Sequence, residues 1–388
     1  MKIAIVLGTR PEIIKLSSII RECKKHSLNY FILHTNQHYS ARLDEIFFDD
    51  LELPPPRYNL NIGSGSHSEE VGKMMIGIEK ILQKEKPSLI LVQGDTNTVL
   101  AGALAASKLH IPVGHVEAGL RSFDRRMPEE INRVLADHIS ERLFAPTKQA
   151  KEQILKEGIS KNKILVSGNT IVDAIFQNLN IAEKKKDILK KLRLNKQNYF
   201  LVTCHRPSNV DNKDNFFKLL REFGKLYRMF KIPLIFPIHP RSSKMLKKFR
   251  LNVPAGLNLI EPAGYLEFLQ LEKNAKLILT DSGGIQEEAC ILKVPCITLR
   301  ENTERLETIY AGANMLMGEN LCEDCQKMIE KNRNWQNPFG NGDSGKKIVK
   351  YILEKNERII KSSFSEHSPN RKKQKEFKQK NPDKKICF

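Results

Sequence analysis

The chain has 388 residues, of which 40% are hydrophobic and 28% are charged, and its formal net charge is +19. Such a length exceeds what one hydrophobic core usually supports, so we expect two domains of similar size. The longest apolar runs, such as residues 89–92, are far too short to cross a bilayer, and we expect no transmembrane helix.

The positive charge does not gather on a nucleic-acid-binding motif. Residues 361–388 contain nine Lys or Arg and three Asp or Glu with few branched apolar side chains, which is typical of a disordered basic tail. Elsewhere the excess falls on segments such as 182–197, where lysines on a solvated helix face explain it. Aromatic residues that would stack on bases do not alternate with these lysines. We therefore expect no nucleic-acid partner and no stable insertion into a membrane.

Seven cysteines, an odd number, lie mostly in apolar segments, as in proteins of a reducing compartment. The cytoplasm is therefore the expected location. Cys322 and Cys325 have the spacing of metal ligands, but no second pair follows to complete a tetrahedral site, so we expect no metal.

Short apolar runs alternate with longer segments of helical periodicity, which predicts an α/β fold of parallel sheets covered by helices on both faces. The first expected strands span residues 2–7, 30–35, 88–92, 112–117, 142–146 and 163–168. After a lysine-rich stretch, five more span residues 199–204, 232–238, 257–260, 276–280 and 295–299. We therefore expect two Rossmann-like doubly wound domains facing each other across a ligand cleft. Their predicted bounds are 1–170 and 171–360, with the last helix returning to the first domain, and the basic tail covers 361–388.

The first strand leads into LGTRPEIIK, in which Pro11 fits the first turn of a helix. Arg10 would then lie at the cleft edge of the sheet, where it could bind a phosphate or pair with a carboxylate. Lys15 would lie nearby, or would simply be an exposed lysine on the surface of the helix. Farther along, QGDTNT places Asp95 after a strand, where it is either a helix N-cap or a reactive carboxylate.

Residues 115–133, HVEAGLRSFDRRMPEEINR, mix four carboxylates with four arginines. A surface ion-pair run is the common explanation for such a mixture. Pro128 fits a first helical position, so the dipole of that helix explains Glu129 and Glu130. It does not explain Glu117, which ends a strand on the same edge as Asp95, and this convergence favours an acid-base site.

The segment TCHRPS places His205 just past another strand, where it either faces a ligand or stabilises a turn. The clearest anion-binding signal is KLILTDSGGIQEEA, residues 276–289. Gly283 and Gly284 allow close approach of a ligand, and free N–H groups then begin a helix. Glu288, about one turn farther, could accept hydrogen bonds from sugar hydroxyls. The alternative is a plain glycine-rich turn with acids at a helix start.

Together these motifs resemble one family, the non-hydrolysing UDP-N-acetylglucosamine 2-epimerases, over residues 1 to about 360. The segments that carry the resemblance are GTRPE, QGDTNT, HVEAGLRS, MPEEINR, GNTIVDA, TCHR, TDSGGIQEEA and RENTERLE. The resemblance implies a glycosyltransferase-B-like (GT-B-like) fold, an active site between the domains and commonly a homodimer. It also implies an isomerase that converts UDP-N-acetylglucosamine (UDP-GlcNAc) reversibly into UDP-N-acetylmannosamine (UDP-ManNAc), a precursor of surface polysaccharides.

The resemblance also implies roles for particular residues. The catalytic residues would be the carboxylates Asp95, Glu117 and Glu129, with His205 at the leaving group and Arg133 in support. The nucleotide-contacting residues would be Arg10, Lys15, Ser282, Gly283, Gly284, Glu288 and Arg305, with Phe268 at the uracil.

The chemistry agrees with these roles. The C2 hydrogen of the sugar is not next to a carbonyl, so inversion at C2 needs another electron sink. Oxidation would require a nicotinamide and its G-x-G-x-x-G turn, which follows no strand here, so we expect no cofactor. Elimination of UDP to a 2-acetamidoglucal, followed by re-addition, needs carboxylates near the sugar and cations with N–H groups on the diphosphate.

The chain departs from many relatives at Ala263, where they carry Gln. It also has QHY (37–39) and HRPS (205–208) where many bacterial members carry QHR and HRRE around an effector site, which argues against allosteric activation by UDP-GlcNAc. Three alternatives share the fold: a hydrolysing 2-epimerase that releases ManNAc and UDP, an epimerase of a modified UDP-sugar such as a diacetamido sugar, and, more distantly, a GT-B glycosyltransferase. A non-enzymatic nucleic-acid binder rests on charge alone.

Overall fold

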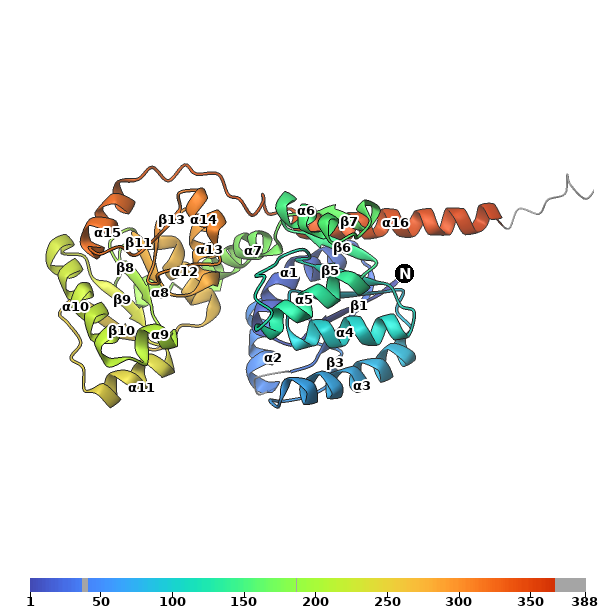
Figure 1. The fold of residues 1–388 in the computed structure, drawn as a ribbon, viewed down its shortest axis with the longest axis horizontal. Helices are drawn as coiled ribbons and strands as arrows, with labels where there is room; N and C mark the ends of the chain where they lie inside the picture. Colours follow the sequence, from blue (N-terminus) through green and yellow to red (C-terminus); the bar gives the residue numbers. More distant parts are fainter. Residues whose placement is uncertain (37–40, 186, 367–388) are drawn as a thin grey trace, which may run out of the picture.

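Two parallel β-sheets, each covered by helices on both faces, form the protein (Figure 1). The computed structural model describes residues 1–36, 41–185 and 187–366. The QHY segment, residues 37–39, lies outside the described residues. Among the residues described, no helix is both long and apolar enough to span a membrane.

The first sheet has the strand order β3-β2-β1-β4-β5-β6-β7. Its strands are β1 (Lys2–Leu7), β2 (Asn29–His34), β3 (Tyr58–Asn59), β4 (Leu89–Gln93), β5 (Val113–Val116), β6 (Arg142–Ala145) and β7 (Ile164–Val166). Its helices are α1 (Arg10–Lys25), α2 (Ala41–Asp50), α3 (His67–Glu85), α4 (Asn97–Lys108), α5 (Pro128–Ile139) and α6 (Lys148–Lys156), and a 3₁₀ turn spans Lys161–Lys163. Every residue of β4 and β5 is buried, as expected for central strands with helices on both faces.

The second sheet has the strand order β10-β9-β8-β11-β12-β13. Its strands are β8 (Phe200–Thr203), β9 (Leu234–Pro237), β10 (Leu257–Ile260), β11 (Leu277–Thr280), β12 (Cys296–Thr298) and β13 (Asn314–Leu316). Its helices are α9 (Pro207–Val210), α10 (Lys213–Phe230), α11 (Pro240–Phe249), α12 (Tyr265–Asn274), α13 (Gly283–Leu292), α14 (Leu306–Tyr310) and α15 (Leu321–Glu330). In both sheets the order reverses beside the first strand, between β1 and β4 and between β8 and β11. Ligands of doubly wound sheets bind at such switch points.

The predicted doubly wound fold is confirmed, because all eleven expected strands occur with ends shifted by at most two residues. Two strands were not predicted. β3 has only two residues and β13 only three, and both lie at a sheet edge. Neither contains the continuous apolar run that marks a strand buried on both faces.

The chain passes between the sheets through α7 (Thr170–Lys185) and α8 (Ile188–Lys191), and it returns through α16 (Ser344–Glu366) (Figure 1). Residues 348, 349 and 352 of α16 are buried in the core that α1 shares with the first sheet. The Asp173 carboxylate of α7 accepts hydrogen bonds from the N–H groups of Ser344 and Gly345 at 3.1 and 2.9 Å. These hydrogen bonds connect α7 to the start of α16. A domain boundary near residue 170 stays a prediction.

Helix α16 continues to Glu366, six residues into the segment expected to be a disordered tail. Lys, Ile, Arg and Glu, which dominate residues 353–361, are compatible with a helix, so the basic composition does not end it at residue 361. Residues 367–388 lie outside the described residues.

Candidate active site

The loops that follow β1 and β4 are tied together by one buried carboxylate. Glu12 of α1 accepts hydrogen bonds from the N–H groups of Gly8 and Thr9, both at 2.8 Å, and from the Thr96 hydroxyl at 2.7 Å. A side chain at position 8 would meet the Thr98 hydroxyl at 2.2 Å, so the close approach of the two loops requires glycine there. Burial raises the pKa of Glu12 to about 7 although these donors lower it. The motifs GTRPE and QGDTNT therefore form one connected loop pair.

Glu117 follows β5 in a left-handed backbone conformation, with φ of +71°. Its carboxylate accepts hydrogen bonds from the Lys15 ammonium at 2.6 and 2.8 Å and from the Gln93 side chain at 2.7 Å. Burial alone would raise the pKa of Glu117, but Lys15, Arg305 and Gln93 together lower it below its ordinary value. The carboxylate is thus buried and ionised, and Lys15 is its counter-ion rather than a surface lysine.

The second domain adds its own charges to this pair. Arg305, the N-cap residue of α14, lies 3.1 Å from the Glu287 carboxylate of α13, measured from Nε to Oε1. Glu287 interacts electrostatically with Lys15 and Glu117, and Arg305 interacts with Glu117. Burial raises the pKa of Glu287 although both cations lower it. Two cations and two carboxylates from both domains therefore alternate across the cleft, and we call these four residues, Lys15, Glu117, Glu287 and Arg305, the cleft charge cluster.

Asp95 and Arg133 form an ion pair at the carboxyl edge of the first sheet. Arg133 also contacts Glu130 at 2.8 Å, and Glu130 in turn accepts hydrogen bonds from the N–H groups of Ser122 and Phe123. Asp95 keeps 36% of its side-chain surface exposed, so it remains accessible to a ligand. Arg133 therefore holds Asp95 in place and links it to the loop that follows Glu117.

The remaining residues of the 115–133 stretch have separate roles. Glu129 is exposed, and no hydrogen bond or ion pair of its carboxylate is found in the described part of the chain. The pair of Asp124 and Arg126 is an exposed surface ion pair. The stretch thus contains both features that its sequence predicted: Glu117, Glu130 and Arg133 belong to the buried contacts described above, and Asp124 and Arg126 form a surface ion pair.

His205 and Asp281 lie side by side at the carboxyl edge of the second sheet. Asp281 is fully buried and accepts hydrogen bonds from the N–H groups of His205 and Arg206, both at 2.8 Å. Its other oxygen lies 3.3 Å from His205 Nδ1. Burial lowers the pKa of His205, Asp281 opposes this, and His239, Arg206 and Arg241 lower it further. The imidazole is therefore oriented by Asp281 and is neutral at pH 7.

The anion-binding signal lies at the start of α13. Ser282 is the N-cap, and Gly283 and Gly284 are the first two helical residues. A side chain at Gly283 would meet the Glu304 carboxylate at 2.6 Å, so the helix start is closely packed against the loop that carries Arg305. The free N–H groups of this turn thus point to the same region as the cleft charge cluster.

The other predicted contact residues lie on α1, α12 and α13. Arg10 is the first residue of α1 and lies 5.7 Å above the ring of Phe47. Phe268 of α12 is partly buried against the core of the second domain. Glu288 lies one turn into α13 and is partly buried, and burial raises its pKa to about 7.

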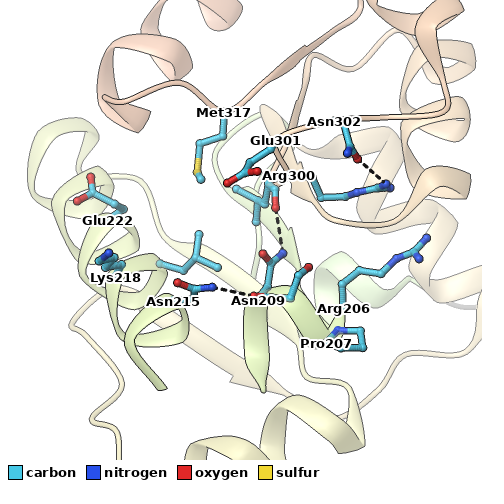
Figure 2. Close-up of a pocket in the computed structure, with 13 residues that line it drawn as sticks. Arg206, Pro207, Asn209, Asn215, Lys218, Glu222, Arg300, Glu301, Asn302 and Met317 are labelled. Atoms are coloured by element: carbon cyan, nitrogen blue, oxygen red, sulfur yellow. Dashed lines mark hydrogen bonds between the residues drawn. The ribbon is translucent and has the colours of Figure 1, made fainter. Parts of the chain in front are cut away.

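A cavity of about 620 Å³ opens on the second domain and is lined by Arg206, which follows His205 in the chain (Figure 2). Arg206, Asn209, Lys218 and Arg300 line it together with apolar residues such as Leu219, Leu299 and Met317, so its wall is mixed. Asn209 also donates a hydrogen bond to Asp281 at 3.0 Å, which connects this wall to the His205 site. The cavity is lined by the second domain only and does not contain the cleft charge cluster.

Sequence reasoning missed a buried network behind Glu117. His115 of β5 contacts the Gly94 carbonyl and the Asp137 carboxylate, both at 2.7 Å, and is fully buried. Asp137 also contacts Arg121 at 2.7 Å and accepts a hydrogen bond from the N–H of Gly119. This network fixes the backbone on both sides of Glu117 and next to Asp95. A histidine inside a buried strand was the only signal in the sequence.

The two cysteines with metal-ligand spacing do not form such a site. Burial raises the pKa of both Cys322 and Cys325, which disfavours the thiolate that a metal needs. In the described ranges, no three His, Cys, Asp or Glu side chains are grouped to hold a metal ion.

Comparison with known proteins identifies the family. A family model described as UDP-N-acetylglucosamine 2-epimerase matches residues 21–353. The chain belongs to the UDP-N-acetylglucosamine 2-epimerase family. It is 60% identical over 361 residues to the UDP-N-acetylglucosamine 2-epimerase of Methanocaldococcus jannaschii, covering 91% of this chain and 99% of that protein. A crystal structure of the M. jannaschii enzyme in complex with UDP-GlcNAc and UDP is similar with a TM-score of 0.79, 60% identity and coverage of 91% of this chain and 100% of that one.

Similarity extends to more distant proteins. A Pseudomonas aeruginosa UDP-2,3-diacetamido-2,3-dideoxy-D-glucuronate 2-epimerase is 37% identical over 359 residues, covering 91% of this chain and 99% of that protein. MurG from Acinetobacter baumannii is 11% identical with a TM-score of 0.53 over 91% of this chain and 99% of that one, and it shares the fold alone. The family and the GT-B-like fold expected from the sequence are both confirmed.

Proposed function

We propose that this protein interconverts UDP-GlcNAc and UDP-ManNAc by eliminating UDP and adding it back, without releasing free sugar. Membership of the epimerase family supports the overall reaction. The observation that carries the mechanism is Glu117, a buried carboxylate that Lys15 keeps ionised and that faces Arg305 of the other domain. A base and a cation for a departing anion thus belong to one cluster.

In the elimination step, a carboxylate removes the proton at C2 of the sugar. The C1–O bond breaks, its electron pair leaves with UDP, and a double bond forms between C1 and C2. The product is a 2-acetamidoglucal. The negative charge that develops on the diphosphate would be stabilised by Arg305 and by the N–H groups at the start of α13, because fixed donors stabilise such charge strongly.

In the return step, a proton reaches C2 from the opposite face and the UDP oxygen forms the C1–O bond again. Two proton-transfer groups are needed, one on each face, and Asp95, Glu117 and Glu129 are the candidates. Arg133 would hold Asp95 in position, and His205, neutral in the free protein and oriented by Asp281, would contact the leaving diphosphate. Atoms and charges balance over the two steps, so no cofactor is required.

The nucleotide would lie over the second sheet. Ser282, Gly283 and Gly284 would bind the diphosphate through their N–H groups, and Arg10 would add a cation from the first domain. Phe268 would contact the uracil and Glu288 the ribose hydroxyls. In this arrangement the N-terminal domain carries the catalytic residues and the C-terminal domain binds the nucleotide, with a domain boundary near residue 170.

The 37% identical P. aeruginosa relative supports a second substrate class, modified UDP-sugars with substituents at C3 or C6. The decisive experiment is incubation of the purified protein with UDP-GlcNAc in D₂O, followed by NMR. UDP-ManNAc carrying deuterium at C2 is the expected product. Accumulation of free ManNAc would favour the hydrolysing reaction, and turnover of a diacetamido sugar alone would favour the modified substrate. If UDP-GlcNAc is not converted at all, a glycosyltransferase that needs an acceptor would be favoured.

We further propose that the protein is a homodimer. Ile131 and Leu135 lie one turn apart on α5, and Phe123 and Met127 lie in the segment just before the helix. All four apolar residues are exposed, by 41%, 43%, 75% and 39%, and exposed apolar surface of this kind marks an association site. A cytoplasmic location is also proposed, because all six cysteines in the described part of the chain are free thiols.

A further inference from the structure

The backbone of Arg305 is enclosed in a ring of hydrogen bonds. Its N–H donates to the Thr303 hydroxyl at 3.0 Å, and that hydroxyl donates to the Gln286 side-chain carbonyl at 2.5 Å. The Arg305 carbonyl accepts a hydrogen bond from the Thr308 hydroxyl at 2.7 Å. Asn314 closes the ring, because its amide donates to the Thr308 hydroxyl at 3.0 Å and to the Gln286 carbonyl at 3.2 Å. Both polar backbone groups of Arg305 are thus held.

The hydrogen bonds of this ring allow one arrangement only. Gln286 and Thr308 are fully buried, and Asn314 is 2% exposed. Each hydroxyl in the ring accepts one hydrogen bond and donates another, so reversing either hydroxyl would leave a buried polar group unpaired. The Asn314 amide is oriented in addition by the Thr298 hydroxyl, which donates to its carbonyl at 2.9 Å. Removing one member of the ring would therefore release the backbone of Arg305.

Helix α13 holds the guanidinium of Arg305 as well as its backbone. Glu287, the residue after Gln286 on this helix, lies 3.1 Å from Arg305 Nε. Its charge raises the pKa of Arg305, and burial opposes the rise. A guanidinium on a mobile backbone would also be drawn toward the other carboxylates with which it interacts, such as Glu117 and Glu304. The ring opposes this movement and so keeps the guanidinium where a ligand in the cleft can reach it.

We propose that Gln286 is a positioning residue for the epimerase reaction: it fixes the backbone of Arg305, so that the guanidinium meets the diphosphate where charge develops as the C1–O bond breaks. This inference rests on the proposed function, in which Arg305 stabilises the departing diphosphate. Fixed charges are effective because they need no reorganisation during the reaction. UDP carries the terminal charge that the bound nucleotide sugar acquires only on elimination. The ring should therefore matter more for kcat and for UDP binding than for KM of the nucleotide sugar.

The test opens the ring at two of its members. Thr303→Val removes a hydroxyl from a partly buried residue at nearly unchanged volume, and Gln286→Leu removes the acceptor. Each should lower kcat for UDP-GlcNAc about tenfold and change KM by less than about threefold, since misplacement of a reacting group by about 1 Å costs up to about 10²-fold. Calorimetry should show that UDP binds to both variants correspondingly more weakly. Thr303→Ser keeps the hydroxyl and Gln286→Glu keeps a carbonyl oxygen, so both should retain most of the wild-type kcat.

A double-mutant cycle with Arg305→Ala separates positioning from a general loss of stability. If the ring acts through Arg305, Thr303→Val should lower kcat in the wild type and have no further effect in the Arg305→Ala protein. Tyr199→Phe is the matched control. It removes a buried hydrogen bond to the Leu271 carbonyl, and Tyr199 precedes β8 at the amino edge of the same sheet, so kcat should be unchanged.

The possible results separate the inference from the proposed function. Additive losses in the cycle, or equal losses for Thr303→Ser and Thr303→Val, would overturn the positioning role and leave the epimerase intact. An equal loss of kcat in Tyr199→Phe would mean that stability alone explains the effect, and would also overturn it. A wild type that does not convert UDP-GlcNAc would instead refute the proposed function, and UDP calorimetry on the same variants would still decide whether the ring positions Arg305.

Discussion

The Lys15 ammonium lies 2.6 Å from the Glu117 carboxylate, although 102 residues separate the two in the chain. One residue comes from α1 and the other from the end of β5, and the parallel first sheet brings both to its carboxyl edge. Since Lys15 offsets the effect of burial on the pKa of Glu117, the pair holds an ionised base in a place where water is largely excluded.

Replacing Glu117 with Gln should therefore abolish most of the turnover. The amide cannot accept a proton, and general-base catalysis contributes about 10²- to 10⁴-fold, so kcat for UDP-GlcNAc should fall by about that factor. The rate of UDP-ManNAc formation measured by NMR gives kcat directly. The matched control is Asp124→Asn, which removes a carboxylate of the same loop from an exposed ion pair with Arg126. A Glu117→Gln enzyme with more than half of the wild-type rate would exclude this residue as a proton-transfer group.

The sequence predicts the location of the site better than its internal contacts. Apolar runs identify the interior strands, and polar residues that follow them must lie at the carboxyl edge of their sheet. This places Asp95 and Glu117 at the edge of the first sheet and His205 at the edge of the second. Whether Lys15 points into this edge or into solvent depends on the rotation of α1 against the sheet. That rotation is set by packing and leaves no mark in the spacing of charged residues.

Buried polar pairs are hidden from the sequence for a similar reason. His115 and Asp137 are 22 residues apart, the first within a buried strand and the second on the buried side of an amphipathic helix. Glu272 follows an apolar helical segment and looks like a surface glutamate of α12, yet it is fully buried. The burial of each of these side chains can be recognised only when the helix or strand that packs against it is known.

Arg133 should act through Asp95 rather than on the sugar. An Arg133→Gln change removes its contacts with both Asp95 and Glu130, so Asp95 would lose its fixed orientation. Misplacement of a catalytic group by about 1 Å costs about 10²-fold, so we expect a loss of kcat of roughly tenfold to a hundredfold. Deuterium incorporation at C2 under single-turnover conditions measures the affected step. Arg126→Gln, which removes an exposed arginine of the same stretch, should be silent, and equal losses in both variants would contradict the assignment.

His115 should be a stabilising imidazolium. Both of its ring nitrogens face acceptors, the Gly94 carbonyl and the Asp137 carboxylate, so both must carry hydrogen. His115→Asn would leave Asp137 with a weakened set of partners, and breaking a buried pair costs about 3–5 kcal/mol of the free energy of unfolding. Urea unfolding at pH 6 measures the loss. His138→Gln, which alters a half-exposed histidine of α5, should change stability by less than about 0.5 kcal/mol.

The same pair predicts how the loss depends on pH. Burial opposes protonation of His115, but Asp137 and the Gly94 carbonyl raise its pKa above 6.5, so its contribution is complete below pH 6.5 and disappears as the pH rises through the raised pKa. The pKa of Asp137 is lowered by His115 and Arg121 in spite of burial, so its contribution is complete above pH 3.8 and disappears as the pH falls through the lowered pKa. The stability difference between wild type and His115→Asn should therefore be largest between these limits and shrink on both sides. A difference that does not vary with pH would mean that His115 has the same pKa in the folded and unfolded protein, and a difference that grows as the pH rises above 6.5 would mean that His115 is neutral when folded.

The apolar face of α5 should hold two copies of the chain together. Light scattering should give the wild type twice the chain mass of 44.5 kDa. Ile131→Glu places a charge in the middle of the face, and because a two-fold interface contains each residue twice, association should weaken at least about tenfold. Phe217→Glu is the matched control, since this side chain of α10 is 54% exposed but lies on the other domain. A wild type that stays monomeric at every concentration would contradict the homodimer, and dissociation by Phe217→Glu rather than Ile131→Glu would move the interface to the second domain.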